Sequence, residues 1–247
     1  MGRRTLRHRR IRLLAVTVAA VAALAAANWL VQLARKPSEA FFPLDTALAK
    51  TPAQTWREYG ALFREHSTAL MTPELLAALA QTEGAGNPVA RTYWRWRAAW
   101  NPLELYRPAS SAVGMYQITD ARFAEARRYC IHDHVPVEVG PWHDFGSCWF
   151  NAFYLRVRPS DAIELTAAFL DRRVGQVLAR QAVAGATAQQ KQDLAAVIHL
   201  CGAAAADAYA RRGFRPAPGE RCGEHALAAY LARLNALKRQ FSLLSRA

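Results

Sequence analysis

Acidic side chains are missing from the first 36 residues of this 247-residue chain. Those residues hold eight of the 32 lysines and arginines, and the other 24 are nearly balanced by the 19 aspartates and glutamates. A nucleic-acid-binding protein normally carries its basic excess on the folded domain. The uneven distribution therefore argues against nucleic acid as a partner and gives the net charge of +13 a different origin.

Charge of either sign is also missing from Leu13 to Ala34, a run of 22 residues. As a helix rising ~1.5 Å per residue, this run would span about 33 Å, the thickness of a membrane's hydrocarbon core. The arginines before it satisfy the positive-inside rule. We therefore predict a basic cytoplasmic segment at 1–12, a transmembrane anchor at 13–34 and a tether at 35–50, with the remainder exported.

A cleaved signal peptide is the alternative, because Ala25, Ala26 and Ala27 offer small residues to a peptidase. The apolar run continues past them from Trp29 to Leu33, which favours a retained anchor. A single-pass inner-membrane protein with its body in the periplasm is the expected localisation.

Clear strand patterns and internal repeats are lacking, and helical periodicity dominates the exported part. We expect one mainly α-helical domain at 51–247, long enough to bury a core. Two aromatic-rich stretches, 91–107 and 131–158, follow neither period. The predicted helices are 52–70, 73–83, 119–129, 161–181, 188–202 and 225–244.

The four cysteines agree with export to an oxidising compartment. Their order suggests Cys130 with Cys148 and Cys201 with Cys222, although three pairings are possible. Each bridge would close a loop of about 20 residues and contribute about 3 kcal/mol.

Zinc is the competing use of the first two cysteines, since four potential ligands lie between them. Their spacing matches no two-plus-two zinc pattern, so we predict neither a metal nor a cofactor. These residues are His132, Asp133, His134 and His143.

Glu83 is the strongest candidate for chemistry. Leu75, Leu79 and Glu83 share one apolar helix face, so the carboxyl is expected to be partly desolvated, which favours its neutral form. Gly84 is expected to end the helix, and the negative end of the helix dipole acts in the same direction. A glycosidic general acid needs such a raised pKa. The alternative is a glutamate that turns out to solvent.

Two blocks around this residue resemble the soluble lytic transglycosylase domain family, which is related to goose-type lysozyme. The first is Ala80-Gln-Thr-Glu-Gly-Ala-Gly-Asn-Pro88 and the second is Ser110-Ser-Ala-Val-Gly-Met-Tyr-Gln-Ile-Thr119. The resemblance implies a lysozyme-like helical fold with Glu83 as the catalytic acid/base. It also implies that residues of the second block line the sugar groove, namely Ser111, Met115, Tyr116 and Gln117.

A third family block, usually Ala-Tyr-Asn-x-Gly, has a weaker echo from Ile198 to Gly202. The family's tyrosine supports the glutamate, which makes His199 its candidate substitute. Leu194 and Val197 lie on another face of the helix, so His199 is expected to reach the groove. A surface histidine or a satisfied core histidine is the alternative.

Three features depart from the family, over a resemblance that covers roughly 70–210. Gly84 replaces the usual serine, Met115-Tyr116 replaces Leu-Met, and the link between the first two blocks is longer. Aromatic rings in that link are suited to stacking on sugars and its arginines to meeting carboxylates, or the link is a flap packed on the domain. The side chains concerned are Tyr93, Trp94, Trp96, Trp100, Tyr106, Arg91, Arg95, Arg97 and Arg107.

The implied reaction is non-hydrolytic cleavage of the β-1,4 bond between N-acetylmuramic acid and N-acetylglucosamine, which leaves 1,6-anhydro ends on peptidoglycan glycan strands. A lysozyme-type hydrolase is the nearest alternative, with Asp120 or Asp133 to activate water. A non-catalytic glycan-binding or scaffold protein of an envelope complex is an alternative of another class, and it would not need Glu83.

Overall fold

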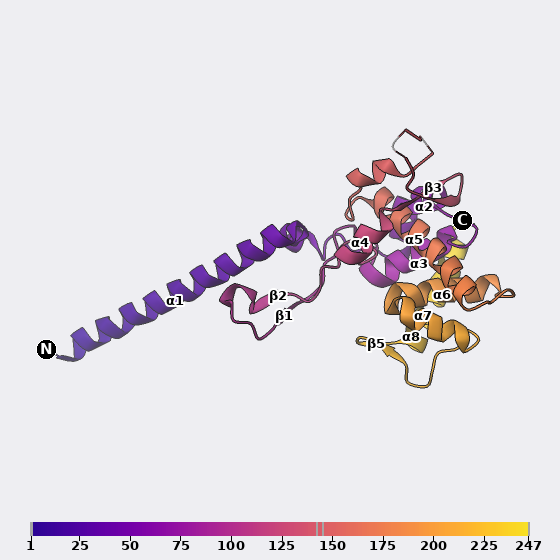
Figure 1. Ribbon diagram of the computed structural model, residues 1–247. Helices are drawn as coiled ribbons and strands as arrows, with labels where there is room; N and C mark the ends of the chain where they lie inside the picture. The colour runs from indigo at the N-terminus through magenta and orange to yellow at the C-terminus, as the bar shows by residue number, and fades with distance from the viewer. Residues whose placement is uncertain (1, 142, 145, 247) are drawn as a thin grey trace. The chain divides into compact units, whose positions relative to one another are not determined.

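The computed structural model describes residues 2–141, 143–144 and 146–246. These residues form eight α-helices and three two-stranded antiparallel hairpins, so the expectation of a mainly helical chain is confirmed (Figure 1). Contacts divide the chain into two units. One comprises Met1–Pro43 with Thr92–Ser111, and the other Leu44–Arg91 with Ala112–Ala247.

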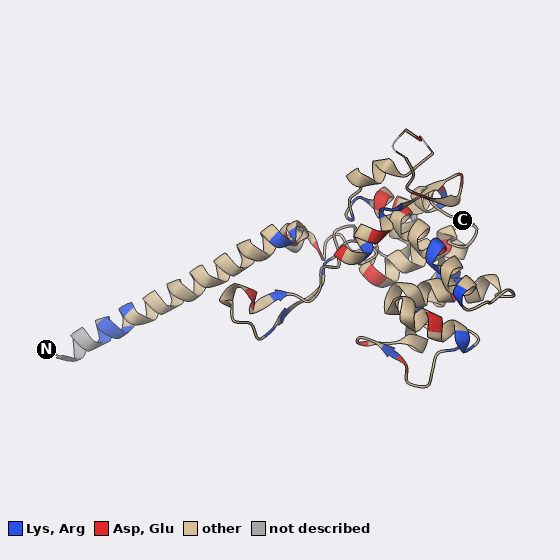
Figure 2. Cartoon of the chain, in the orientation of Figure 1, with Lys and Arg blue, Asp and Glu red and all other residues tan. Residues whose placement is uncertain are grey.

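The first unit begins with helix α1, Gly2–Arg35. Its segment Arg7–Arg35 has a mean hydropathy of 2.1 in its most apolar window and is long and apolar enough to cross a membrane, by length and composition. Figure 2 shows basic residues near both ends of the helix and none along its middle. The helix is therefore compatible with the predicted single-pass anchor. A 3-10 helix, η1 (Pro37–Leu44), occupies part of the predicted tether.

The aromatic link at 91–107 is a hairpin of β1 (Trp94–Trp96) and β2 (Tyr106–Pro108), with the 3-10 helix η2 (Pro102–Glu104) between them. It packs along the last turns of α1. Three-residue strands are too short to show an alternating pattern in the sequence, which is why this stretch followed no period.

The second unit is built around helix α3, Pro73–Gly84, which packs against α2 and α8. Thr72 caps α3 by accepting a hydrogen bond from the Leu75 amide, and Pro73 occupies its first turn. The apolar faces of α2, α3, α5, α6 and α8 meet in one hydrophobic core. The remaining helices are α2 (Pro52–Glu65), α4 (Asp120–Ala126), α5 (Pro159–Arg180), α6 (Ala188–Cys201), α7 (Ala203–Arg211) and α8 (Leu227–Leu244).

The helix predicted at 119–129 is too long at its C-terminal end. Helix α4 stops at Ala126, and Tyr129 begins a hairpin of β3 (Tyr129–His132) and β4 (Val135–Glu138). The Asn151 side chain donates to the Tyr129 carbonyl at 2.6 Å and so holds the chain in this extended form. Residues 149–153, inside the second aromatic stretch, form the 3-10 helix η3 (Trp149–Phe153).

Both predicted disulfides are confirmed: Cys130 is bonded to Cys148, and Cys201 to Cys222. The first closes the region around β3 and β4. The second joins the end of α6 to a small hairpin, β5 (Arg221–Cys222) and β6 (His225–Ala226), that leads directly into α8. Because these sulfurs are used in bridges, they are not thiolate ligands for zinc. Among the residues described by the structure, no group of three or more His, Cys, Asp or Glu side chains is placed to hold a metal ion.

Candidate active site

Glu83 lies in the last turn of α3, where the helix ends in a left-handed residue. That residue is Ala85, with φ of 49°, and it directly follows Gly84, the last residue of α3. The prediction that the helix ends at Gly84 is therefore confirmed. The buried residues that precede Glu83 on α3 anchor the helix in the core. The carboxyl group is therefore held at a fixed place at the edge of the core.

The Glu83 side chain is only 16 % exposed, which excludes the alternative of a glutamate turned out to solvent. The Tyr230 hydroxyl on α8 donates a hydrogen bond to Glu83 Oε1 at 2.5 Å. Burial raises the pKa of Glu83, and this outweighs the Tyr230 hydrogen bond and the nearby charges that lower it. The neutral, proton-donating form of Glu83 is thus favoured to higher pH than for an ordinary glutamate.

Three basic groups surround this carboxyl. Besides the Tyr230 hydrogen bond, the influences that lower the pKa of Glu83 are the charges of His225, Arg122 and Arg233. Each would stabilise the ionised carboxylate once a proton has left. The site therefore combines burial, which favours the acid, with basic groups, which favour its conjugate base.

His199 lies next to Glu83, with its Nε2 3.8 Å from Glu83 Oε1. The side chain is only 3 % exposed, so His199 is buried at the site and is not a surface residue. Burial, and then the charge of Arg122, hold the pKa of His199 well below its usual value, so the ring is neutral. His199 is therefore no charged partner for Glu83 near neutral pH.

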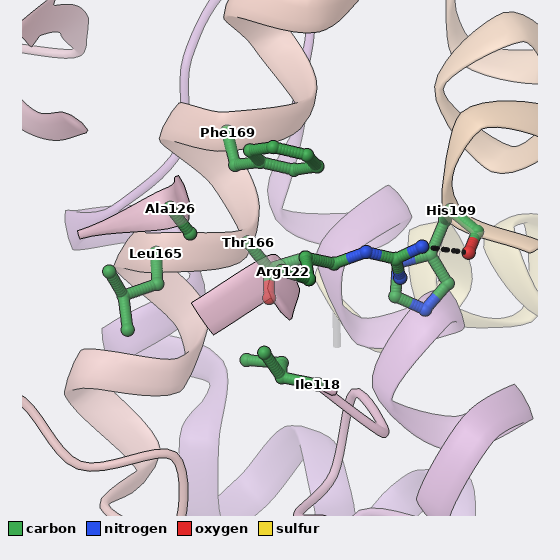
Figure 3. A pocket seen from close by; sticks show the side chains of 7 residues that line it. All are labelled: Ile118, Arg122, Ala126, Leu165, Thr166, Phe169 and His199. Carbon is green, nitrogen blue, oxygen red and sulfur yellow. Dashed lines mark hydrogen bonds between the residues drawn. The ribbon is translucent and has the colours of Figure 1, made fainter. Parts of the chain in front are cut away.

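Arg122 fixes the orientation of that ring. Its Nη2 donates to the His199 carbonyl oxygen at 2.8 Å, and its Nη1 lies 3.4 Å from His199 Nδ1 (Figure 3). Because arginine can only donate, Nδ1 accepts in this contact, which assigns the ring proton to Nε2, 3.8 Å from Glu83 Oε1. The ring also forms a hydrogen bond with the backbone of Tyr116. The three helices α3, α4 and α6 thus contribute one polar cluster.

A cavity of about 10 Å³, room for one water molecule, adjoins Arg122 and His199. Apolar side chains form most of its wall, as Figure 3 shows. Glu83 does not line this cavity. The lining residues are Ile118, Arg122, Ala126, Leu165, Thr166, Phe169 and His199.

The second sequence block lies against the C-terminal end of α3 at Met115, and the side chains of Met115 and Tyr116 point into the core. Met115 and Tyr116 are fully buried, and the Tyr116 hydroxyl donates to the Leu76 carbonyl at 3.1 Å. The Gln117 amide donates to the carbonyls of Ala90 and Gly114. Met115 and Tyr116 therefore support α3 from within the core, and contact between Gln117 and a sugar stays a prediction.

Ser111, the remaining predicted groove residue, is grouped with the N-terminal unit. Its predicted role in binding a sugar stays a prediction. The four residues from Gly114 to Gln117, in contrast, belong to the same unit as Glu83.

Gly84 is explained by the close approach of this block. A Cβ atom at Gly84 would lie 2.8 Å from Met115 Cα and 3.0 Å from Met115 O, both backbone atoms. Contacts this short are not tolerated, so the position that carries serine in the resembling family must be glycine here unless the Met115 backbone moves. The departure at Gly84 is thus coupled to the position of the second block.

Gly84→Ser is expected to displace the backbone at Met115 and to lower the free energy of unfolding by about 1–3 kcal/mol, as overpacking does. Thermal denaturation measures the loss. Gly175→Ser is the matched control, because a Cβ atom there would meet nothing within 4 Å. Equal stability of the two variants would contradict the close approach.

Four residues at the site were not predicted from the sequence, namely Tyr230, Arg122, His225 and Arg233. Tyr230 occurs in a run of apolar residues at helical spacing, which gives no sign of its hydroxyl group's partner. The partner is 147 positions away in sequence, so no local signal could reveal it.

Tyr230→Phe removes the hydrogen bond that favours the ionised form of Glu83, so the pKa of Glu83 should rise further. If Glu83 acts as an acid catalyst, the alkaline limb of the pH–activity profile is then expected to move to higher pH. The rate is expected to fall by roughly tenfold to a hundredfold, since a hydrogen bond to a charged group contributes about 1.5–3 kcal/mol. An unchanged profile would show that the phenol does not tune the acid. Tyr209→Phe, another buried tyrosine of the same unit, is the control.

Glu164 is a second buried glutamate, at 6 % exposure, and it differs from Glu83 in its partners. Its Oε1 accepts from the Ile131 amide at 2.9 Å, and its Oε2 accepts from the Tyr154 hydroxyl at 2.7 Å. With both oxygens bound, Glu164 joins α5 to β3 and is assigned a structural role.

A scan against protein-family models, a search of curated protein sequences and a search of solved structures each found no match to this chain. The resemblance to the lytic transglycosylase domain, and with it the lysozyme-like fold, stays a prediction.

Proposed function

We propose that this chain is a membrane-anchored lytic transglycosylase that cleaves peptidoglycan glycan strands, with Glu83 as its single acid/base. The observation that supports the proposal is a carboxyl group largely removed from water, with a raised pKa, fixed by one phenol at the edge of the core. A general acid for glycosidic cleavage requires this combination.

The first step uses the proton of Glu83. Because Oε1 accepts from Tyr230, we assign proton transfer to Oε2, which protonates the oxygen leaving the muramyl C1. The bond between C1 and that oxygen breaks, and positive charge develops on the sugar ring. Arg122 and Arg233 stabilise the carboxylate that remains.

The second step returns the proton. The Glu83 carboxylate takes it from the muramyl C6 hydroxyl, whose oxygen forms a bond to C1 and closes the 1,6-anhydro ring. No water is consumed, and the enzyme ends in the protonation state in which it began. Neutral His199 lies beside Glu83 Oε1 with its Nε2 3.8 Å away, so it adds no charge to the site during either step.

A single carboxylate distinguishes this reaction from the usual two-carboxylate hydrolysis. Asp120 is exposed and forms an ion pair with Arg156, and Asp133 lies in the exposed turn between β3 and β4. Neither is among the charges that act on the pKa of Glu83. The two candidates for a water-activating base are thus occupied or exposed, which favours the transglycosylase over the hydrolase.

The proposed location is the inner membrane, crossed once by α1, with the second unit in the periplasm. The arginines that precede the apolar run favour a cytoplasmic N-terminus. Two disulfides in the second unit support an oxidising compartment. The peptidoglycan layer is then within the compartment that the site faces.

Digestion of purified sacculi by the full-length protein, followed by mass spectrometry of the released muropeptides, tests the proposal. The expected products carry 1,6-anhydro ends and are one water lighter than hydrolysis products. Reducing ends would establish the hydrolase instead. Binding to sacculi without any product would establish the scaffold.

A further inference from the structure

The hairpin of the first unit is fastened to the C-terminal end of α1. Asn28 Nδ2 donates to the Tyr106 carbonyl and Gln32 Nε2 to the Leu103 carbonyl, both at 2.8 Å. Arg35 adds an ion pair with Glu104 at 2.9 Å. Asn28, Gln32 and Arg35 are spaced i, i+4 and i+7, so they form one polar stripe along the helix. The hairpin therefore covers two turns of α1 along this stripe.

A second set of contacts fixes the orientation of the hairpin. Trp94 Nε1 donates to Glu39 Oε2 at 2.8 Å, and Lys36 pairs with Glu39 at 3.0 Å. Glu39 is 1 % exposed, so this ion pair lies inside the unit. Hairpin, η1 and the end of α1 are thus held together by buried polar contacts.

The two faces of the hairpin have different chemistry. In the β1–β2 register Trp96 lies opposite Tyr106, with ring centroids 4.9 Å apart, and Arg95 lies opposite Arg107. Since side chains alternate between the faces of a strand, one face is aromatic and the other basic. Arg107 also lies 3.8 Å from Glu104, a carboxylate that it shares with Arg35, so this face keeps a net positive charge that a bound anion would balance.

Large apolar surface is left uncovered on this hairpin. Trp96 is 76 % exposed, and Trp100, in the connection between the strands, is fully exposed. Water-exposed tryptophans on a segment that is otherwise fixed in place mark an interaction surface.

We propose that the hairpin Trp94–Pro108 is an interfacial membrane anchor, with Trp96 and Trp100 in the headgroup layer and Arg95 and Arg107 on anionic lipid phosphates. Continuity with α1 supports a lipid surface over a sugar. Asn28 lies six residues before the end of the uncharged run, and Arg35 directly follows that end. The hairpin therefore extends from the outer part of the hydrocarbon core, about 9 Å below the end of the run, into the interfacial layer of a bilayer. Tryptophan and tyrosine concentrate at this depth. The inference depends on the part of the proposed function that places α1 across a membrane.

Tryptophan quenching tests the proposal on the full-length chain in vesicles of phosphatidylethanolamine and phosphatidylglycerol brominated near the headgroup. The wild type is compared with Trp96→Phe/Trp100→Phe and, as control, with Trp149→Phe from the second unit. We expect the quenched part of the emission to fall by roughly half in the double variant, because Trp29 on α1 and Trp94 in the hairpin remain at the membrane. It is expected to stay unchanged in the control.

Two outcomes would overturn the inference while leaving the anchor intact. In the first outcome, the chain resists carbonate extraction, but brominated lipid does not quench the emission of Trp96 and Trp100. The other is quenching of the same emission by soluble glycan strands in place of lipid, which would establish the sugar-stacking interpretation. Release of the chain by carbonate would overturn the anchor together with this inference, whereas sacculus digestion reports on Glu83 separately.

Discussion

Glu83→Gln is expected to lower the rate of sacculus digestion by about 10⁴-fold or more. Glutamine keeps the shape of the side chain and can still accept a hydrogen bond from Tyr230, but it can neither give up nor recover a proton. General acid–base catalysis contributes on the order of 10²–10⁴-fold, and this substitution removes both the acid and the base role. Release of 1,6-anhydro muropeptides over time is the measurement.

The same variant should be more stable than the wild type at neutral pH. Burial raises the pKa of Glu83 in the folded protein above its ordinary value of 4.5, so the folded state binds more protons than the unfolded state in the range above 4.5. The free energy of unfolding of the wild type therefore falls as pH rises from about 4.5 to the raised pKa, and it then stays low. Glutamine does not titrate and avoids this loss.

Thermal denaturation of the wild type and Glu83→Gln across this pH range tests whether the variant is the more stable protein. The difference in melting temperature should be near zero at about pH 4 and should grow in favour of Glu83→Gln as the pH rises. A variant that is less stable than the wild type at neutral pH would contradict the desolvated carboxyl.

Glu164→Gln is the matched control for activity, because Glu164 is also buried and also accepts from a tyrosine hydroxyl. It should keep wild-type activity if catalysis belongs to Glu83. Comparable loss in both variants would assign the Glu83 effect to structure, and full activity in Glu83→Gln would exclude the proposed mechanism.

Local pattern predicted the features that depend on neighbours in the sequence. Thr72 and Pro73 mark the start of α3, and the apolar face from Leu75 to Leu79 predicts that Glu83 is held at the edge of the core. The order of the cysteines suggested the two bridges that the structure contains. The position of Glu83 on its own helix could therefore be predicted from the sequence.

Most long-range contacts of the site were not accessible, although the family resemblance led us to expect His199 near Glu83. Tyr230 and Arg122 reach the site from α8 and α4, and an apolar stripe does not distinguish a tyrosine that binds a carboxylate from one that fills the core. The need for glycine at position 84 was not predictable either. The backbone that a Cβ atom there would meet belongs to Met115, which is 31 positions away and is brought close only by the fold. The short strands at 94–96 and 106–108 were missed because three residues show no period.

The disulfide between Cys201 and Cys222 should affect the site more than its counterpart does. Cys201 ends α6, two positions after His199. Cys222 pairs in register with His225, whose charge acts on Glu83 and whose ring centroid lies 6.4 Å from that of Tyr230. The bridge therefore ties together two elements that each bring a side chain to Glu83.

Replacement of either pair by alanine is expected to cost about 3 kcal/mol, because the two loops have nearly equal sequence separations of 18 and 21. Melting temperatures should fall by roughly 6–12 °C in both double variants, at 2–4 °C per kcal/mol for a body of this size. Stability alone thus does not separate the bridges, and this makes them suitable controls for each other.

Activity should separate them. At a temperature where both double variants remain folded, Cys201→Ala/Cys222→Ala should digest sacculi more slowly than Cys130→Ala/Cys148→Ala and should show a displaced alkaline limb in its pH profile. The cause is the freed β5–β6 hairpin, which no longer fixes His225, a group that lowers the pKa of Glu83, so that pKa should rise. The limb is accordingly expected to move to higher pH. Identical profiles for the two variants would show that the bridge at Cys201 stabilises the fold without positioning the acid.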